Sequence, residues 1–331
     1  MIWVKRGITI LAFSIVLYLF WPLLGELRKT ANLFREAQWG WIVAAILLQF
    51  ASYASLTGLN QLLLRPFAGK ISFWRMMAVL SSLAFIEVAI PSAGVSGVVL
   101  RARLLGKSGY SLEASMFTVF LEAIYISSVM IVVSLAGIWY LVQYGQVRRF
   151  QWVLLASLTL IAICAGLLAY WAGRDRNRAK RWALKGGKTW SWVLEKFNRP
   201  PLVLDETINR VDIFFNGLEH LGRTPRWPFT MTSIGRVLLD VATLGACFAA
   251  FHFPISPGIL LTGYGLTLTL SGLSAIPGGL GLADASLAVI YARLGAPGAV
   301  AVAAALTYRI IAYWLIRFAG FINWIILEAK S

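Results

Sequence analysis

Long runs of apolar residues, separated by short polar stretches, extend along the whole chain. Six runs are long enough to cross a hydrocarbon layer of about 30 Å as helices that rise roughly 1.5 Å per residue. They cover residues 8–24, 40–64, 111–143, 150–172, 230–251 and 297–327. None shows the alternation over about ten residues that is typical of barrel strands. The pattern therefore predicts an all-α polytopic membrane protein with six transmembrane helices.

Two further hydrophobic segments, residues 73–105 and 258–292, are each short for two full crossings and are broken in the middle. The breaks read AIPSAGVSG and AIPGGLG, in which proline removes a backbone donor and glycine permits a turn. In lipid the freed backbone groups must be covered by protein or water. We therefore expect two re-entrant hairpins against a cavity; a kink or a tight loop between two short spans is the alternative. The helix-breaking residues are Pro91, Gly94, Gly97, Pro277, Gly278, Gly279 and Gly281.

Composition and charge agree with this assignment and add an orientation. The chain is 59% hydrophobic, with a mean hydropathy of +0.74, and its net charge of +16 reflects basic loops. Residues 174–226 hold 12 Lys and Arg against 6 Asp and Glu, which places this loop in the cytoplasm. Working outward from it places both termini in the cytoplasm and brings the two hairpins in from opposite faces. No nucleic-acid partner is expected, because basic cytoplasmic loops account for the charge.

The chain is therefore expected to be one integral membrane domain, residues 1–331, that contains an inverted repeat. Each broken hairpin is followed by a glycine-containing turn and a long helix, and setting Gly106 against Gly295 aligns several further small residues. Such repeats are common in transporters, where discontinuous helices meet near the midplane. Residues 173–229 are expected to form a basic cytoplasmic loop with interfacial amphipathic helices, since apolar residues within it follow helical spacing.

Seven charged residues fall within the predicted spans or hairpins, where each costs about 2.5–3.5 kcal/mol on insertion scales. Arg236 and Asp240 lie four residues apart on one helix, so we expect them to pair. The whole set is either a structural ion-pair network or a polar lining that handles a charged headgroup or a proton. The seven are Glu87, Glu122, Arg236, Asp240, Asp284, Arg309 and Arg317.

Arg309 lies near mid-depth and needs an anion, for which Glu87, Glu122 and Asp284 are the candidates. Arg101 follows the first break, where it either receives a lipid phosphate or simply belongs to the basic cytoplasmic side. The two cysteines lie in apolar spans and the two histidines are far apart, so no disulfide, metal or cofactor is expected.

The regions PSAGVSGVVLRARLLGKSGYSLEAS…VFLEAIY and PGGLGLADASLAVIYARLG…AALTYRIIAYWLIRFAGFINW resemble the two signature regions of the lysylphosphatidylglycerol synthase transmembrane family. The resemblance implies a helical bundle of lipid-flippase type in the bacterial inner (plasma) membrane. By position it carries the functional acids and arginines of the family onto Arg101, Glu122, Asp284 and Arg309. The family usually has glutamate at Asp284, and many members have arginine where this chain has Ala123.

We expect from this resemblance a membrane protein that moves a lipid or lipid-linked headgroup between leaflets. Its partners would be membrane lipids, either an anionic phospholipid or a lipid-linked substrate, bound at Glu87, Arg101, Glu122, Asp284 and Arg309. The alternative is a non-transporting partner or scaffold for a lipid- or glycan-modifying enzyme. Enzymatic activity is not expected, because the longest stretch outside the membrane is far below the roughly 100–150 residues of a typical catalytic domain.

Overall fold

All secondary structure in the described part of the chain is helical. The computed structural model describes residues 33–89, 95–143, 181, 204–273 and 282–329. Four stretches within it are long and apolar enough to cross a membrane: Trp39–Leu64, Leu112–Tyr140, Trp227–Ala250 and Gly298–Glu328. The prediction of an all-α membrane protein is confirmed. The predicted spans 8–24 and 150–172 lie outside the described residues.

The helices begin and end close to the boundaries expected from hydropathy. The first half contains α3 (Trp39–Leu64), α4 (Phe73–Ala89), α5 (Val95–Gly106) and α6 (Leu112–Gln143). After α9 (Leu204–Gly222), the second half contains α10 (Trp227–Ala250), α11 (Pro257–Leu273), α12 (Leu282–Arg293), α13 (Gly298–Arg309), the π-helical η2 (Ile310–Leu315) and α14 (Ile316–Ala329). Both expected hairpins are therefore pairs of short helices, α4 with α5 and α11 with α12.

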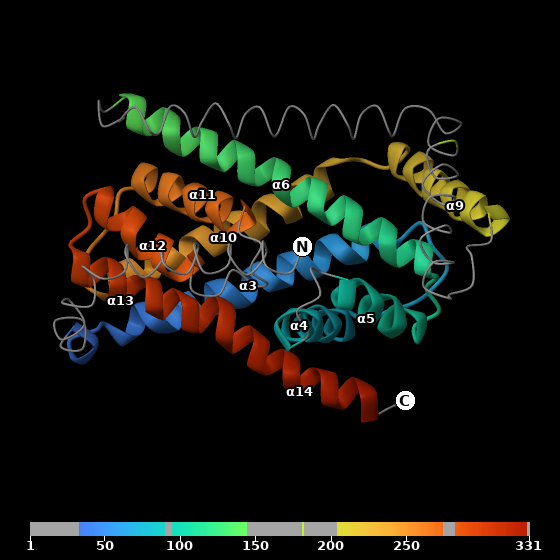
Figure 1. The fold of residues 1–331 in the computed structure, drawn as a ribbon, viewed down its shortest axis with the longest axis horizontal. Helices are drawn as coiled ribbons and strands as arrows, with labels where there is room; N and C mark the ends of the chain where they lie inside the picture. The colour runs from blue at the N-terminus through green and yellow to red at the C-terminus, as the bar shows by residue number, and fades with distance from the viewer. Residues whose placement is uncertain (1–32, 90–94, 144–180, 182–203, 274–281, 330–331) are drawn as a thin grey trace, which may run out of the picture.

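The long helices α3 and α10 pack along each other through the centre of the molecule (Figure 1). In that view the α4–α5 hairpin lies on the right of this pair and the α11–α12 hairpin on the left. Each hairpin packs against a long helix from the other half of the chain: α4 packs against α14, and α11 packs against α6. Each half therefore supplies the helix that supports the hairpin of the other.

Glycine permits close approach at both of these supporting contacts. A Cβ atom added to Gly320 of α14 would lie 2.0 Å from the carbonyl oxygen of Ser81 on α4. A Cβ atom added to Gly137 of α6 would lie 2.5 Å from the backbone nitrogen of Thr262 on α11. Small residues at such crossings are typical of helix packing in membranes, where close backbone approach supplies much of the attraction.

Polarity is distributed as expected for a protein surrounded by lipid. Large apolar side chains point outward, and Val132 and Trp139 on α6 and Phe318 on α14 are each about two-thirds exposed. Polar side chains of α3 point inward instead, at spacings of three to five residues along one face. This buried polar stripe of α3 consists of Gln49, Ser52, Thr57 and Asn60. Because water is absent from a lipid environment, these groups need partners within the protein.

The turns that follow α5 and α12 share one geometry, the Schellman motif. Gly109 and Gly295 adopt left-handed backbones, with φ angles of +84° and +106°, which glycine tolerates without steric cost. The matching backbone hydrogen bonds run from Tyr110 to Leu105, Gly109 to Gly106, Ala296 to Tyr291, and Gly295 to Ala292. Gly109 is therefore the structural counterpart of Gly295, because Gly106 does not have the left-handed backbone. This replaces the alignment that set Gly106 against Gly295.

The corrected register extends through the helices that follow the turns. Gly109 and Gly295 are 186 residues apart (295 minus 109), and the same separation carries Leu112 onto Gly298 and Gln143 onto Ala329. The long helix α6 thus matches α13, η2 and α14 taken together. Within the described residues, α4 and α11 each cover 17 residues, and α5 and α12 each cover 12.

Residues 204–222 of the basic segment form the helix α9, as the helical spacing of their apolar residues predicts. Phe214 of α9 makes edge contacts with Phe117 and Phe120 of α6. A Cβ atom added to Gly217 would lie 2.9 Å from Phe117, so the small residue lets α9 approach α6 closely. Aromatic packing therefore holds α9 beside the first turns of α6.

Candidate functional site

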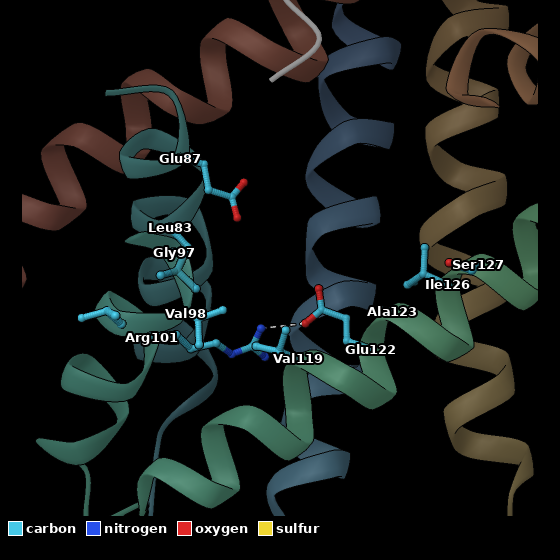
Figure 2. Close-up of a pocket in the computed structure, with 11 residues that line it drawn as sticks. Leu83, Glu87, Gly97, Val98, Arg101, Val119, Glu122, Ala123, Ile126 and Ser127 are labelled. Atoms are coloured by element: carbon cyan, nitrogen blue, oxygen red, sulfur yellow. Dashed lines mark hydrogen bonds and ion pairs between the residues drawn. The ribbon is translucent and has the colours of Figure 1, made fainter. Parts of the chain in front are cut away.

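A cavity of about 620 Å³ opens between α4, α5 and α6 (Figure 2). It lies where the end of α4 faces the beginning of α5. Three of the five residues proposed from the sequence line it, each from a different helix: Glu87 from α4, Arg101 from α5 and Glu122 from α6. The rest of the wall is mostly apolar or small, consisting of Leu83, Gly97, Val98, Val99, Val119, Ala123, Ile126 and Ser127.

Arg101 is the best fixed of the charged residues in this cavity. It is 95% buried, and its Nη1 lies 2.9 Å from Oε2 of Glu122. Its Nη2 donates to the side-chain oxygen of Asn60, which belongs to the buried polar stripe of α3. Its Nε has no hydrogen-bond acceptor among the residues that the structure describes. Figure 2 shows the guanidinium reaching from α5 across the cavity to α6.

Asn60 is a site residue that the sequence reasoning missed. It is fully buried, and its amide nitrogen donates to the carbonyl oxygen of Leu56 one turn earlier, which leaves its oxygen for Arg101. The signal that could have found it is the polar stripe along α3, because polar residues at helical spacing in an apolar span mark the face toward the protein interior.

Glu87 differs from Glu122 in having no fixed partner. Its carboxylate is open to the cavity, and no hydrogen bond or ion pair joins it to any described residue. One side of the carboxylate lies against Gly97, where an added Cβ atom would be 2.9 Å from Oε1. Glycine at this position of α5 is therefore what lets the end of α4 bring its carboxylate into the cavity wall.

The cavity combines a polar centre with an apolar, outward-facing rim. Val99 of α5 is 62% exposed, and Ala123 and Ser127 of α6 are also exposed. These residues lie on the part of the molecule where large apolar side chains face outward. The arrangement can accept a molecule with one charged or polar end and an apolar remainder.

A second polar cluster lies deeper in the bundle, around Asp240 of α10. As expected from the sequence, Arg236 and Asp240 pair, with Nη1 and Oδ1 at 3.2 Å. The hydroxyl groups of Tyr264 on α11 and Tyr308 on α13 both donate to Oδ2 of Asp240. Arg236 also donates to Ser52 of α3. Every member has a partner within the protein, so this cluster is a connector between four helices.

Arg309 stacks on an aromatic ring near the π-helical segment and does not line the cavity described above. Its guanidinium carbon lies 3.7 Å from the ring centre of Tyr313, and that of Arg317 lies 3.2 Å from the same ring. The expected stripe of Arg309, Tyr313 and Arg317 on one helix is therefore present. Among the anions considered for Arg309, Glu122 instead pairs with Arg101.

Several residues proposed from the sequence lie outside what the structure describes. The backbone of Asp284 belongs to α12, but the position of its side chain is not described. Of the helix-breaking residues, Gly97 is buried in α5 against Glu87. The others, Pro91, Gly94, Pro277, Gly278, Gly279 and Gly281, are outside the described ranges. Within those ranges, no group of three or more His, Cys, Asp or Glu is placed to hold a metal ion.

Comparisons with known proteins agree with the fold and with the resemblance read from the sequence. A curated protein described as a UPF0104 membrane protein, from Methanothermobacter thermautotrophicus, is 24% identical over 296 residues, which cover 86% of this chain and 85% of that protein. The family model of the lysylphosphatidylglycerol synthase TM region matches residues 8–320. The match spans both hairpins, the whole of α6, α13 and η2, and the beginning of α14. The chain therefore belongs to the lysylphosphatidylglycerol synthase transmembrane family.

Proposed function

We propose that this protein moves a lipid, or a lipid-linked headgroup, between the leaflets of a plasma membrane, and that the Glu87–Arg101–Glu122 cavity receives the headgroup. The observation that carries the proposal is the buried guanidinium of Arg101 in a cavity with apolar walls and an exposed apolar rim. A headgroup with a phosphate fits the guanidinium, since arginine is well suited to bind phosphate oxygens. The acyl chains would stay against the apolar rim.

The architecture of the two halves supports movement across the membrane. The matched lengths, the shared Schellman turns and the exchange of supporting helices are what an inverted repeat requires. With the basic loop in the cytoplasm, the α4–α5 hairpin enters from the cytoplasmic face and the α11–α12 hairpin from the opposite face. Both hairpins are then re-entrant, and six helices span the membrane with both termini inside. Rocking of one half against the other is the usual route to alternating access in such proteins.

The transport proposal is tested by replacing Arg101 in protein reconstituted into liposomes. Arg101→Met should slow the movement of a fluorescent phosphatidylglycerol between leaflets by roughly tenfold or more, since hydrogen bonds to charged groups contribute about 1.5–3 kcal/mol. Arg103→Met is the matched control, because Arg103 lies on the same helix but is exposed and pairs with Glu328. The control should move the lipid at the wild-type rate.

A second variant separates loss of function from loss of fold. Arg101→Met alone leaves Glu122 without its ion pair, whereas Arg101→Met combined with Glu122→Gln removes both charges together. This double variant should remain folded and inactive. Wild-type lipid movement in it would contradict a role for the cavity. Absence of lipid movement by the wild-type protein, with function instead lost on deletion of α9, would favour the scaffold alternative.

A further inference from the structure

The charges that line the cavity do not balance, and this imbalance bears on what it binds. Glu122 and Arg101 form an ion pair and neutralise each other at 2.9 Å. Glu87 adds one further negative charge with no donor within hydrogen-bond distance in the described part of the chain. An ionised and unpaired carboxylate beside apolar walls carries a free-energy cost. A lipid phosphate placed at Arg101 would add a second unbalanced negative charge to the same small volume.

A proton bound to Glu87 offsets the second negative charge that a lipid phosphate brings. With Glu87 ionised, the empty cavity carries a net charge of −1 from its three charged side chains. A phosphodiester headgroup brings one negative charge, and a proton that a buffer acid in bulk solvent gives up to a Glu87 oxygen brings one positive charge. The loaded cavity then has the same net charge as the empty one. We infer that Glu87 is a proton-binding site, and that one proton binds with each anionic lipid headgroup; this inference rests on the proposed function.

The surroundings of Glu87 single it out for this role. Charged or titratable groups from every helix around it lie within electrostatic range: Arg101 on α5, Glu122 on α6, Arg317 on α14 and Tyr53 on α3. Glu122 is held by Arg101, and Arg317 stacks on Tyr313 and donates to its carbonyl oxygen at 3.1 Å. Glu87 is the carboxylate that is exposed in the cavity and has no such fixed partner among the described residues.

Thermodynamic linkage between proton binding at Glu87 and headgroup binding makes the inference quantitative. If the anion favours proton binding at Glu87, the proton favours anion binding by the same factor. Affinity for an anionic headgroup should therefore rise by up to about tenfold for each unit by which the pH falls, within the range where binding takes up a full proton. A headgroup amine that paired with Glu87 would give the opposite dependence, because protonation would remove its partner.

The test measures proton uptake directly. Detergent-solubilised full-length protein is titrated calorimetrically with short-chain phosphatidylglycerol between about pH 5 and pH 8, in buffers of different ionisation enthalpy. Wild-type protein should take up close to one proton per lipid at the pH values where affinity is most pH-dependent. Glu87→Gln, which mimics the protonated side chain, should bind at least as tightly, take up no proton, and show no dependence on pH. Glu113→Gln, on α6 outside the cavity lining, is the control and should behave as wild type.

Each other outcome has a distinct meaning. Binding that needs Arg101 but takes up no proton, or that keeps its pH dependence in Glu87→Gln, overturns the proton inference and leaves the proposed function intact. Weaker binding in Glu87→Gln also overturns it, because the carboxylate would then contact a cationic group of the ligand. Binding that Arg101→Met leaves unchanged contradicts the proposed headgroup site itself. A folded Glu87→Gln protein is verified by its elution as a single symmetric peak.

Discussion

At the scale of single residues, the structure separates charges that hold the bundle together from charges that face a cavity. Asp240 accepts hydrogen bonds from Tyr264 and Tyr308 and pairs with Arg236, so it joins α10 to α11 and α13. Glu87 has no partner of this kind. The difference arises because two hydroxyl donors reach Asp240 from neighbouring helices and Arg236 pairs with it from the same helix, whereas Glu87 lies at the end of α4 beside Gly97 and the cavity.

Replacement of Asp240 tests the connecting role. Asp240→Ala leaves the half-buried Arg236 without its ion-pair partner and should destabilise the protein by up to about 3–5 kcal/mol. Tyr308→Phe removes one hydrogen bond to a charged group and should cost about 1.5–3 kcal/mol. The measurement is thermal or denaturant unfolding in detergent. Equal stability of Asp240→Ala and wild type would show that the cluster does not hold the helices together.

Gly97 gives a second test at this scale, aimed at the cavity. Gly97→Ala places a methyl group 2.9 Å from Oε1 of Glu87 and should displace the carboxylate from the wall. Because a flexible side chain can move aside, we expect little loss of stability but altered pH dependence of lipid binding. Calorimetric titration at two pH values checks this expectation. A pH dependence identical to wild type would mean that the position of the Glu87 carboxylate does not matter.

At the scale of helices, the hairpins depend on helices from the other half of the chain. The described parts of their helices, of 17 and 12 residues, are shorter than the four stretches that could span a membrane. The crossing of α4 with α14 is close because Gly320 lies against Ser81, and Asn323 of α14 also donates to the Ser81 hydroxyl at 3.0 Å. Packing between the halves therefore fixes the position of α4, which forms one wall of the cavity.

A larger residue in place of Gly320 should weaken the packing of α4 against α14. Gly320→Ala would place a methyl group 2.0 Å from a backbone oxygen, which cannot rotate away, so α4 and α14 must separate. We expect lower stability and slower lipid movement. Gly40→Ala is the matched control, since nothing lies within 4 Å of its added Cβ atom and alanine favours helix by up to about 1 kcal/mol. Comparable unfolding temperatures for the two variants would contradict the tight crossing.

At the scale of the whole molecule, the two halves agree in architecture more closely than in chemistry. The register set by the turns carries Glu122 onto Tyr308 and Ala123 onto Arg309, 186 residues apart in each case. A charged cavity residue in the first half thus corresponds to a tyrosine of the Asp240 cluster in the second. On the proposed function, the first half would bind the headgroup and the second half would support it.

The opposite orientation that we propose for the two halves has a direct test. In a background with Cys164 and Cys247 replaced by alanine, single cysteines are placed at Gly106 and Arg293, both exposed at corresponding helix ends. A membrane-impermeant thiol reagent should label Gly106→Cys from the cytoplasmic side and Arg293→Cys from the opposite side. Labelling of both positions from one side would rule out an inverted repeat.

The sequence by itself determined the helical membrane fold, the boundaries of the helices that the structure describes, the division of residues 73–105 and 258–292 into pairs of shorter helices, and the Arg236–Asp240 pair. These features follow from hydropathy, from proline and glycine chemistry, and from i to i+4 spacing, which are all local. The tertiary structure alone decided that Glu122 pairs with Arg101 and not with Arg309. It also decided that Asn60 completes the site by accepting a hydrogen bond from Arg101. These partners lie 21 and 41 residues from Arg101 along the chain and meet only because α3 and α5 both pack against α6.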